Sequence, residues 1–303
     1  MKNVENQNSE NTARPRVAVI GAGTMGGAMA SRLLASGLGV AGWARHPEST
    51  AGLLELGATG HSSAADAVAE ADVVLTTLPT LEATRSVMFD ASVLDAMRPG
   101  TTWAQMATIG VAATEQLYGE TVSRRPDVIF VDAPVSGSRQ PAESGQLLIL
   151  ASGAEPTTGF LEPVFAALGK ATLWLGPVGA GSRMKLVMNT WLAFQTEGAA
   201  ESAALAERLD IDPAFLFEAL RDSPMASPYA VAKLTKMVRE DYGADFALDW
   251  ALKDLDLVAS DGGAEAAPVA MVIAERWRQL VADGASGLDV SAARRGLGVP
   301  VRH

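Results

Sequence analysis

The chain of 303 residues is longer than one typical domain, which predicts two domains, and its 48% hydrophobic and 19% charged residues are typical of a globular protein. A formal net charge of −11 argues against nucleic acid as a general partner, because neutralising phosphates requires clustered Lys and Arg. Cysteine is absent, which excludes disulfides and thiolate chemistry, and no run of about eighteen apolar residues is present to cross a bilayer.

The N-terminal segment MKNVENQNSENT is polar and includes Glu5 and Glu10. It lacks the apolar core of a signal peptide and the Arg-rich amphipathic pattern of a transit peptide. We therefore expect a disordered N-terminus over residues 1–15 and a cytoplasmic protein with no membrane partner.

From Arg16 onward, short β-branched runs alternate with amphipathic segments. This alternation is typical of parallel strands joined by helical crossovers, so it predicts an α/β domain with a doubly wound sheet. The predicted strands cover residues 17–20, a short run near Val40, 72–79, 101–105, 127–135, 147–150 and 171–175. Helices are predicted over residues 25–34 and 155–168.

After Gly181 the pattern changes to a stretch rich in Ala, Leu, Met and Glu that has no strong breaker before about Leu209. It predicts one long helix followed by further helices. We therefore place the domain boundary near residue 178, with the α/β domain over 16–178 and an all-α domain over 179–303. The long helix is more apolar than one small domain can cover, which predicts a homodimer or homotetramer.

A glycine-rich turn, Gly21-Ala22-Gly23-Thr24-Met25-Gly26, follows the first predicted strand and opens the first predicted helix. In a dinucleotide-binding turn, the first glycine permits the tight turn and the second lets the backbone approach the pyrophosphate. The third lets the helix pack closely on the strand. The helix N-terminus then faces the phosphates. The alternative is a glycine-rich turn that binds no ligand.

The end of the second predicted strand indicates which dinucleotide is bound. NAD sites normally carry an acidic residue there for the ribose hydroxyls, but this segment reads Gly42-Trp43-Ala44-Arg45-His46. Arg45 would stack on the adenine and pair with a 2′-phosphate, with Ala44 and His46 beside it. The sequence therefore predicts NADP(H), with NAD less favoured. The alternative for Arg45 is a solvated surface arginine.

Four further segments resemble motifs of one enzyme family. They are VDAPVSGSRQPAESGQLLIL (131–150), GAGSRMKLVMN (179–189), WALKDLDLVA (250–259) and Leu78-Pro79. These are similar to the substrate loop, the GxGxxxKxxxN catalytic motif, the KDL segment and the cofactor loop of the 3-hydroxyisobutyrate dehydrogenase (β-hydroxyacid dehydrogenase) family, in the 6-phosphogluconate dehydrogenase-like superfamily. Together with the glycine-rich turn they span most of the chain.

The resemblance implies an N-terminal Rossmann domain, a long interdomain helix and an all-α C-terminal domain that helps to close the cleft and form dimers. It also implies an NADP(H)-dependent oxidoreductase that interconverts a small 3-hydroxy acid and its semialdehyde. The substrate would be a small anionic carboxylate of the 3-hydroxyisobutyrate or glyoxylate and succinic semialdehyde type.

Carried over by motif, Lys185 would be the acid/base and Asn189 would orient both substrate and lysine. Ser136, with the backbone of Gly137 and Ser138, would bind the substrate carboxylate. The residues leave other interpretations open. Lys185 would otherwise snorkel to water or pair with a carboxylate. Ser136 would otherwise be a turn-stabilising serine.

At the nicotinamide end, the resemblance implies that Thr108 and Lys253 line the cofactor, while Leu78-Pro79 forms its loop. For Lys253 the alternative is a charged helix face with i,i+4 pairs. That face would also include Asp249, Asp254 and Asp256.

Two segments depart from the usual family pattern. The substrate loop usually reads Ser-Gly-Gly, but this chain has Ser138 at the third position. The segment 107–110 reads Ala-Thr-Ile-Gly, where the family usually has Ser-Thr-Ile-Ser or a similar run. Both departures concern the identity of the substrate more than the type of reaction.

Lys185 and Asn189 lie one helical turn apart, within reach of a common ligand. The apolar residues around them predict a helix that is buried on most sides. The three histidines, His46, His61 and His303, show no metal-ligand spacing, so no metal site is predicted.

Two other functions remain open. Imine reductases and reductive aminases share the two-domain layout, but those relatives generally carry an acidic residue or a tyrosine at the position of Lys185. A non-catalytic dinucleotide-binding scaffold is the second, because a fold alone does not fix a function. Lys185 argues against the first function, and retention of both Lys185 and Asn189 argues against the second.

Overall fold

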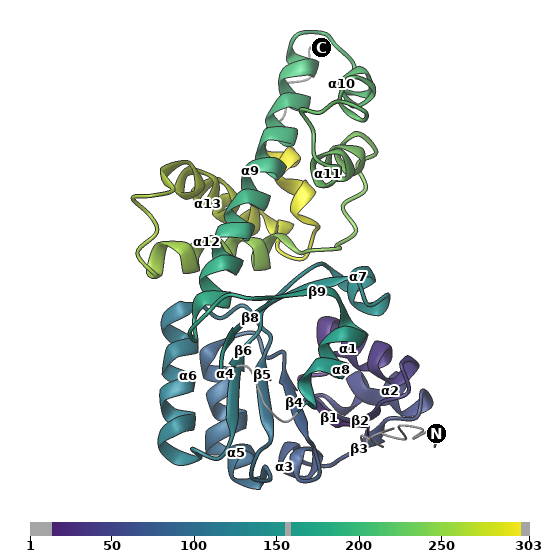
Figure 1. The fold of residues 1–303 in the computed structure, drawn as a ribbon. Coiled ribbons are helices and arrows are strands. Elements are labelled where there is room, and N and C mark those ends of the chain that lie inside the picture. Colours follow the sequence, from purple (N-terminus) through teal and green to yellow (C-terminus); the bar gives the residue numbers. More distant parts are fainter. Residues whose placement is uncertain (1–13, 155–158, 298–303) are drawn as a thin grey trace, which may run out of the picture.

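The computed structural model describes residues 14–154 and 159–297 (Figure 1). An α/β domain is followed by the helix α9 (Ala180–Arg208), which rises out of it into a domain made only of helices. The predicted fold class is confirmed: an N-terminal Rossmann-type sheet, a long helix and an all-helical C-terminal domain.

The sheet has nine strands in the described residues, in the order β3-β2-β1-β4-β5-β6-β8-β7, and β9 pairs with β8. β1 to β6 run parallel, whereas β8 runs antiparallel to β6 and β7. The strands are β1 (Arg16–Ile20), β2 (Gly39–Trp43), β3 (Thr59–Gly60), β4 (Val73–Thr76), β5 (Thr102–Gln105), β6 (Ile129–Asp132), β7 (Val135–Ser136), β8 (Leu147–Gly153) and β9 (Gly169–Trp174).

Helices cover both faces of the sheet, so the central strands are buried on both sides and read as continuous apolar runs. One hydrophobic core includes Leu33 and Phe165, from the helices on one face, and a second includes Val68 and Leu117 from the other. The helices are α1 (Thr24–Ala35), α2 (Ala51–Glu55), α3 (Ala64–Val68), α4 (Leu81–Arg85), α5 (Val93–Ala96), α6 (Val111–Arg124), α7 (Arg139–Glu143) and α8 (Leu161–Leu168).

The helical domain packs around α9, with Trp277 fully buried in its core. A buried ion pair between Lys233 Nζ and Asp289 Oδ1 (2.9 Å) ties α11 to the residue that precedes the final 3₁₀ segment. The helices are α10 (Pro213–Leu220), α11 (Pro228–Val238), α12 (Leu248–Ser260) and α13 (Pro268–Leu280), with a 3₁₀ segment at Val290–Leu297. No helix in the described part of the chain is long and apolar enough to cross a membrane.

The first turn of α9 is anchored on the sheet by the buried carboxylate of Asp132, at the end of β6. Asp132 accepts hydrogen bonds from the backbone N–H of Ser182 (2.9 Å), from the Ser182 hydroxyl (2.8 Å) and from the Ser152 hydroxyl (2.9 Å). The Ser152 hydroxyl accepts in turn from the N–H of Gly181 (2.9 Å). Burial raises the pKa of Asp132, and the hydrogen bonds to its carboxylate oppose that change. A side chain from the α/β domain therefore caps the helix that leads into the helical domain.

Two details of the predicted strands are wrong. Residues 127–135 do not form one strand, because Ala133 and Pro134 separate β6 from β7. The 147–150 strand lies in β8, which runs antiparallel to both β6 and β7 and so reverses the direction of the chain at this side of the sheet. The predicted helix at 155–168 forms only over α8, and residues 155–158 of it lie outside the described residues.

The predicted boundary near residue 178 lies close to the start of α9 at Ala180, and the division into 16–178 and 179–303 stays a prediction. Residues 1–13 of the segment expected to be disordered lie outside the described residues. The next residue, Arg14, donates a hydrogen bond from Nη1 to the carbonyl of Gly37 (2.9 Å).

Candidate active site

The glycine-rich turn joins β1 to α1 with a different requirement at each glycine. Gly21 has a φ of +99°, which L side chains rarely adopt. A Cβ added at Gly26 would lie 2.3 Å from the carbonyl oxygen of Gly21, so α1 packs directly on the turn. A Cβ at Gly23 would meet no atom within 4 Å. The backbone at Gly23 is therefore open to a ligand.

The N-terminus of α1 has no side-chain cap and no acidic residue in its first turn. The backbone N–H groups at Thr24 and Met25 therefore have no partner from a capping side chain, and the helix dipole favours an anion there. Gly21 and Ala22 instead donate their N–H groups to the carbonyl of Trp43 (2.9 and 3.1 Å), which ties the turn to β2. This arrangement fits the pyrophosphate of a dinucleotide.

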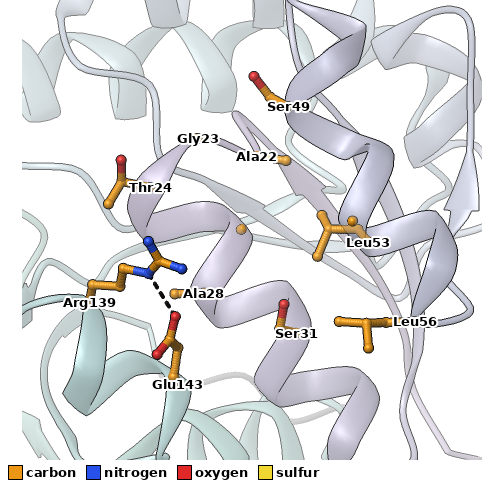
Figure 2. Close-up of a pocket in the computed structure, with 12 residues that line it drawn as sticks. Ala22, Gly23, Thr24, Ala28, Ser31, Ser49, Leu53, Leu56, Arg139 and Glu143 are labelled. Carbon is orange, nitrogen blue, oxygen red and sulfur yellow. Dashed lines mark hydrogen bonds and ion pairs between the residues drawn. The ribbon is translucent and has the colours of Figure 1, made fainter.

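A cavity of about 490 Å³ opens along this helix (Figure 2). Its volume falls within the range of small-molecule sites, about 300 to 1,000 Å³. α7 contributes an ion pair to the wall, Arg139 Nε to Glu143 Oε1 at 2.7 Å. The cavity is lined by Ala22, Gly23, Thr24, Gly27, Ala28, Ser31, Ser49, Gly52, Leu53, Leu56, Arg139 and Glu143.

The predicted cofactor loop lies at the end of β4, beside the glycine-rich turn. Leu78 is buried and packs against Gly21, while Pro79 is exposed. The sequence analysis missed Thr77, whose hydroxyl donates a 2.6 Å hydrogen bond to the carbonyl of Gly21. This bond ties the end of β4 to the glycine-rich turn, so the loop supports the turn.

At the end of β2, Ala44 is partly buried, and the side chains of Arg45 and His46 are exposed. His46 Nδ1 lies 3.6 Å from Glu48 Oε1. Glu48, two positions beyond His46, is an acidic residue that the sequence analysis did not consider. Glu48 places a negative charge beside the residues predicted to bind a 2′-phosphate.

The predicted substrate loop follows β6. Ser136 is partly buried and pairs with Leu148 in β7 and β8. Gly137 has a φ of +135°, and a Cβ there would lie 2.8 Å from Leu147 Cδ2. Only glycine fits at this bend. Ser138 occupies the N-cap position of α7 without a side-chain cap bond, so its hydroxyl is not used in capping.

On α9, Lys185 is partly buried and Asn189 is buried. Asn189 Nδ2 donates a hydrogen bond to Asp254 Oδ2 on α12. Among the described residues, Lys185 has no hydrogen-bond or ion-pair partner. Burial lowers the pKa of Lys185, the negative charge of Asp254 raises it and the positive charge of Lys253 lowers it.

α12 brings a second lysine to the same place. Lys253 Nζ lies 3.0 Å from Asp254 Oδ1 and donates a hydrogen bond to the carbonyl of Thr108, at the end of β5. Asp254 is only 3% exposed, so interpreting it as part of a solvated charged face was wrong. Asp256 does fit that description, since it is half exposed and pairs with Arg278. Asp254 therefore lies within the candidate site, where the sequence analysis did not place it.

The structure thus gathers Lys185, Asn189 and Lys253 around the buried carboxylate of Asp254, with the Thr108 carbonyl beside them. The substrate loop at Ser136 makes no hydrogen bond to these residues in the described part of the chain. The carboxyl ends of parallel strands are where ligands bind in doubly wound sheets. Within the described residues, no group of three or more His, Cys, Asp or Glu side chains has the arrangement of a metal site.

Comparison with known proteins shows the family of each half of the chain. The model of the NAD binding domain of 6-phosphogluconate dehydrogenase matches residues 16–176. The model described as NAD-binding of NADP-dependent 3-hydroxyisobutyrate dehydrogenase matches residues 179–297.

Individual relatives cover nearly the whole chain. Glyoxylate/succinic semialdehyde reductase 1 of Arabidopsis thaliana is 33% identical over 91% of this chain and 96% of its own length. A probable 3-hydroxyisobutyrate dehydrogenase of Mycobacterium tuberculosis is 32% identical over 91% of this chain and 95% of its own length. A solved structure of M. tuberculosis 3-hydroxyisobutyrate dehydrogenase with L-serine has a TM-score of 0.84 at 29% identity, covering 95% of this chain and 100% of that chain. The chain therefore belongs to the 3-hydroxyisobutyrate dehydrogenase (β-hydroxyacid dehydrogenase) family of NAD(P)-dependent oxidoreductases, within the 6-phosphogluconate dehydrogenase superfamily.

Proposed function

We propose that this enzyme uses NADP(H) to interconvert a small 3-hydroxy acid and its semialdehyde, of the 3-hydroxyisobutyrate or glyoxylate and succinic semialdehyde type. The observation that carries the proposal is the position of Lys185. Its amine lies in the cluster formed with Asn189, Lys253 and Asp254, has a lowered pKa and has no partner among the described residues.

A bound nicotinamide supplies the hydride acceptor or donor. In oxidation, Lys185 Nζ in its neutral form takes the proton of the substrate hydroxyl, and in reduction its ammonium returns a proton to the carbonyl oxygen. An unperturbed lysine titrates near about 10.4, so the lowered pKa enlarges the neutral fraction at neutral pH.

Asn189 and Asp254 position this lysine and the substrate oxygen. Because Asn189 Nδ2 donates to Asp254, the amide is held in one orientation and its Oδ1 is left to accept a hydrogen bond. The negative charge of Asp254 is balanced by Lys253, which keeps a buried carboxylate from standing unpaired.

The substrate carboxylate is assigned to Ser136 and to the backbone of Gly137 and Ser138. Support comes from the left-handed bend at Gly137 and from a Ser138 hydroxyl that takes no part in capping α7. Ser138 places a hydroxyl where relatives usually have glycine, which favours substrates with a further polar group near the carboxylate.

NADP(H) is assigned from Arg45, whose exposed guanidinium lies at the end of β2. A charge-assisted bond to a 2′-phosphate contributes about 1.5 to 3 kcal/mol, or roughly tenfold to a hundredfold in preference. Glu48 acts in the opposite direction, since its carboxylate repels the phosphate and accepts from ribose hydroxyls.

We also propose a homodimer or homotetramer located in the cytoplasm. The interpretation of α9 as buried on most sides is wrong for the single chain, because Val187 is 64% and Trp191 62% exposed. Apolar side chains of this size usually mark an interface. Cell fractionation tests the location.

One experiment tests the proposed reaction. A panel of 3-hydroxy acids, semialdehydes, glyoxylate and cyclic imines is assayed with NADPH, NADH and their oxidised forms, following nicotinamide absorbance. Turnover of semialdehydes or glyoxylate is expected. Turnover of imines alone, or binding of cofactor without any turnover, would replace the proposal with one of the two alternatives.

A further inference from the structure

The helix α6 begins without a cap from its own segment. Gly110 precedes it, has no side chain and holds a φ of +96°, so it supplies no acceptor for the first free N–H groups of the helix.

The missing cap is supplied by Asp261. Its Oδ2 accepts a 2.7 Å hydrogen bond from the N–H of Val111, and its Oδ1 a 3.2 Å bond from the N–H of Ala112. Asp261 is the residue that ends α12, in the helical domain, 150 positions further along the chain than Val111. One carboxylate therefore uses both oxygens to cap a helix of the other domain.

We propose that Asp261 is a positioning residue that sets the loop at the end of β5, including Thr108, from the helical domain. Three residues of one α12 face lie along this loop. Lys253 donates a hydrogen bond to the carbonyl of Thr108. Leu257 packs against Gly110, because a Cβ added at Gly110 would lie 3.0 Å from Leu257 Cδ2. Asp261 completes the row, since positions i, i+4 and i+8 share a helix face.

The first turn of α6 is also held by α9. Thr114 Oγ1 lies 3.1 Å from Ser182 Oγ, and Arg183 Nη2 donates a 2.5 Å hydrogen bond to Glu115 Oε1. α9 and α12 are the helices that carry Lys185 and Asp254. The start of α6 lies below the helical domain in Figure 1. It is therefore held by the same two helices, α9 and α12, that carry the cluster of Lys185 and Asp254.

This contact matters for the cofactor because the loop between β5 and α6 lies at the ligand-binding edge of the sheet. Removing the carboxylate leaves two N–H groups without their acceptor and removes one of the three α12 contacts that hold the loop, leaving those of Lys253 and Leu257. The proposal concerns dinucleotide binding, so it does not depend on which substrate the enzyme takes.

The test compares Asp261→Ala with Asp261→Asn and with Asp256→Ala. The asparagine keeps one acceptor oxygen, and Asp256 is a half-exposed carboxylate on the same helix. We expect Asp261→Ala to accelerate hydrogen exchange of the amides at 108–114 by about fivefold to tenfold, the effect of losing one cap. The NADP(H) dissociation constant, measured by fluorescence titration, should rise about threefold or more. Asp261→Asn should recover part of both effects, and Asp256→Ala should show neither.

A second variant approaches the same contact from the other side. Gly110→Ala adds a Cβ 3.2 Å from Asp261 Oδ2 in a strained conformation, whereas Gly119→Ala, on the same helix, adds one that meets no atom within 4 Å. Gly110→Ala should weaken cofactor binding. The loss of affinity in the double variant with Asp261→Ala should be smaller than the sum of the two single losses, because both substitutions disrupt the same contact.

Two results would overturn the proposal. Unchanged exchange at 108–114 in Asp261→Ala would show that the cap is not formed in solution. Faster exchange with unchanged cofactor affinity would make Asp261 a purely structural cap. Neither result bears on whether semialdehydes are substrates.

Discussion

The side-chain amide of Asn189, on α9, donates a hydrogen bond to the carboxylate of Asp254, on α12, 65 positions further along the chain. The bond lies in the interior, beside Lys185, so the charge that acts on the lysine is held in place by its neighbour on the same helix. Changes to this pair should therefore alter the pH dependence of the reaction as well as its rate.

Replacing Asp254 by Asn should move the pH profile. Asp254 raises the pKa of Lys185, so removing its charge lowers that pKa further. Oxidation requires the neutral amine, so its rate rises with pH through the lysine pKa, and this rise should shift to lower pH. Measuring kcat/KM for alcohol oxidation as a function of pH tests this prediction. Asp256→Asn, an exposed carboxylate on the same helix, should leave the profile in place, and an unshifted profile in Asp254→Asn would exclude the charge as the cause.

Replacing Lys185 by Met keeps similar volume and removes the proton carrier. We expect kcat to fall by about 10² to 10⁴ while NADPH affinity and the thermal midpoint change little. The alkaline-side rise in the oxidation rate should disappear. Lys170→Met, at a surface lysine of β9, is the matched control. If Lys185→Met kept more than about a tenth of wild-type kcat with chemistry rate-limiting, the lysine would have a binding or structural role.

Cofactor preference should respond in opposite directions to two neighbouring changes. Arg45→Ala should lower the ratio of kcat/KM for NADPH over NADH by about tenfold to a hundredfold. Glu48→Gln should raise that ratio, because it removes a negative charge near the 2′-phosphate. Steady-state kinetics with both cofactors measure the two ratios. A wild-type preference for NADH would contradict the assignment of Arg45 and leave Glu48 as the ribose ligand.

The oligomeric state can be tested at α9. Trp191→Asp places a charge at a side chain that is 62% exposed in the single chain, so it should not affect folding of the subunit. We expect wild-type protein to sediment as a dimer or tetramer and the variant to shift toward the monomer. Leu54→Asp, 47% exposed on the α/β domain, provides a control. A wild-type monomer of 31.5 kDa would refute the proposal.

Much of the fold follows from local sequence patterns. Buried parallel strands need continuous apolar runs, and the 17–20 and 101–105 runs predicted β1 and β5 closely. The glycine-rich turn was equally predictable, because the backbone of the turn itself requires glycine at Gly21 and Gly26. The antiparallel direction of β8 was missed because the apolar run at 147–150 has the same pattern in a parallel and in an antiparallel strand, and the two-residue β7 has no periodicity to detect.

The site was less predictable because its charged residues depend on distant partners. Asp254 and Asp256 stand two positions apart on one helix, yet only Asp254 is buried, against Asn189 on another helix. In the sequence, Asp261 is an ordinary residue at the end of a helix. Only the structure shows that it caps α6 after Gly110, in the other domain. Glu48 was missed for a simpler reason: it lies two positions beyond the segment 42–46 at the end of β2.

The Asp132 carboxylate, which accepts hydrogen bonds from the first turn of α9, couples the folding of the two domains. The α/β domain completes a helix of its neighbour through Asp132, and the neighbour completes α6 through Asp261. A chain cut near residue 178 would leave Asp132 buried without Ser182 and α6 without its acceptor, so each fragment would lose hydrogen bonds that only the other provides. The two halves match separate family models but are expected to unfold together, in one thermal transition rather than two.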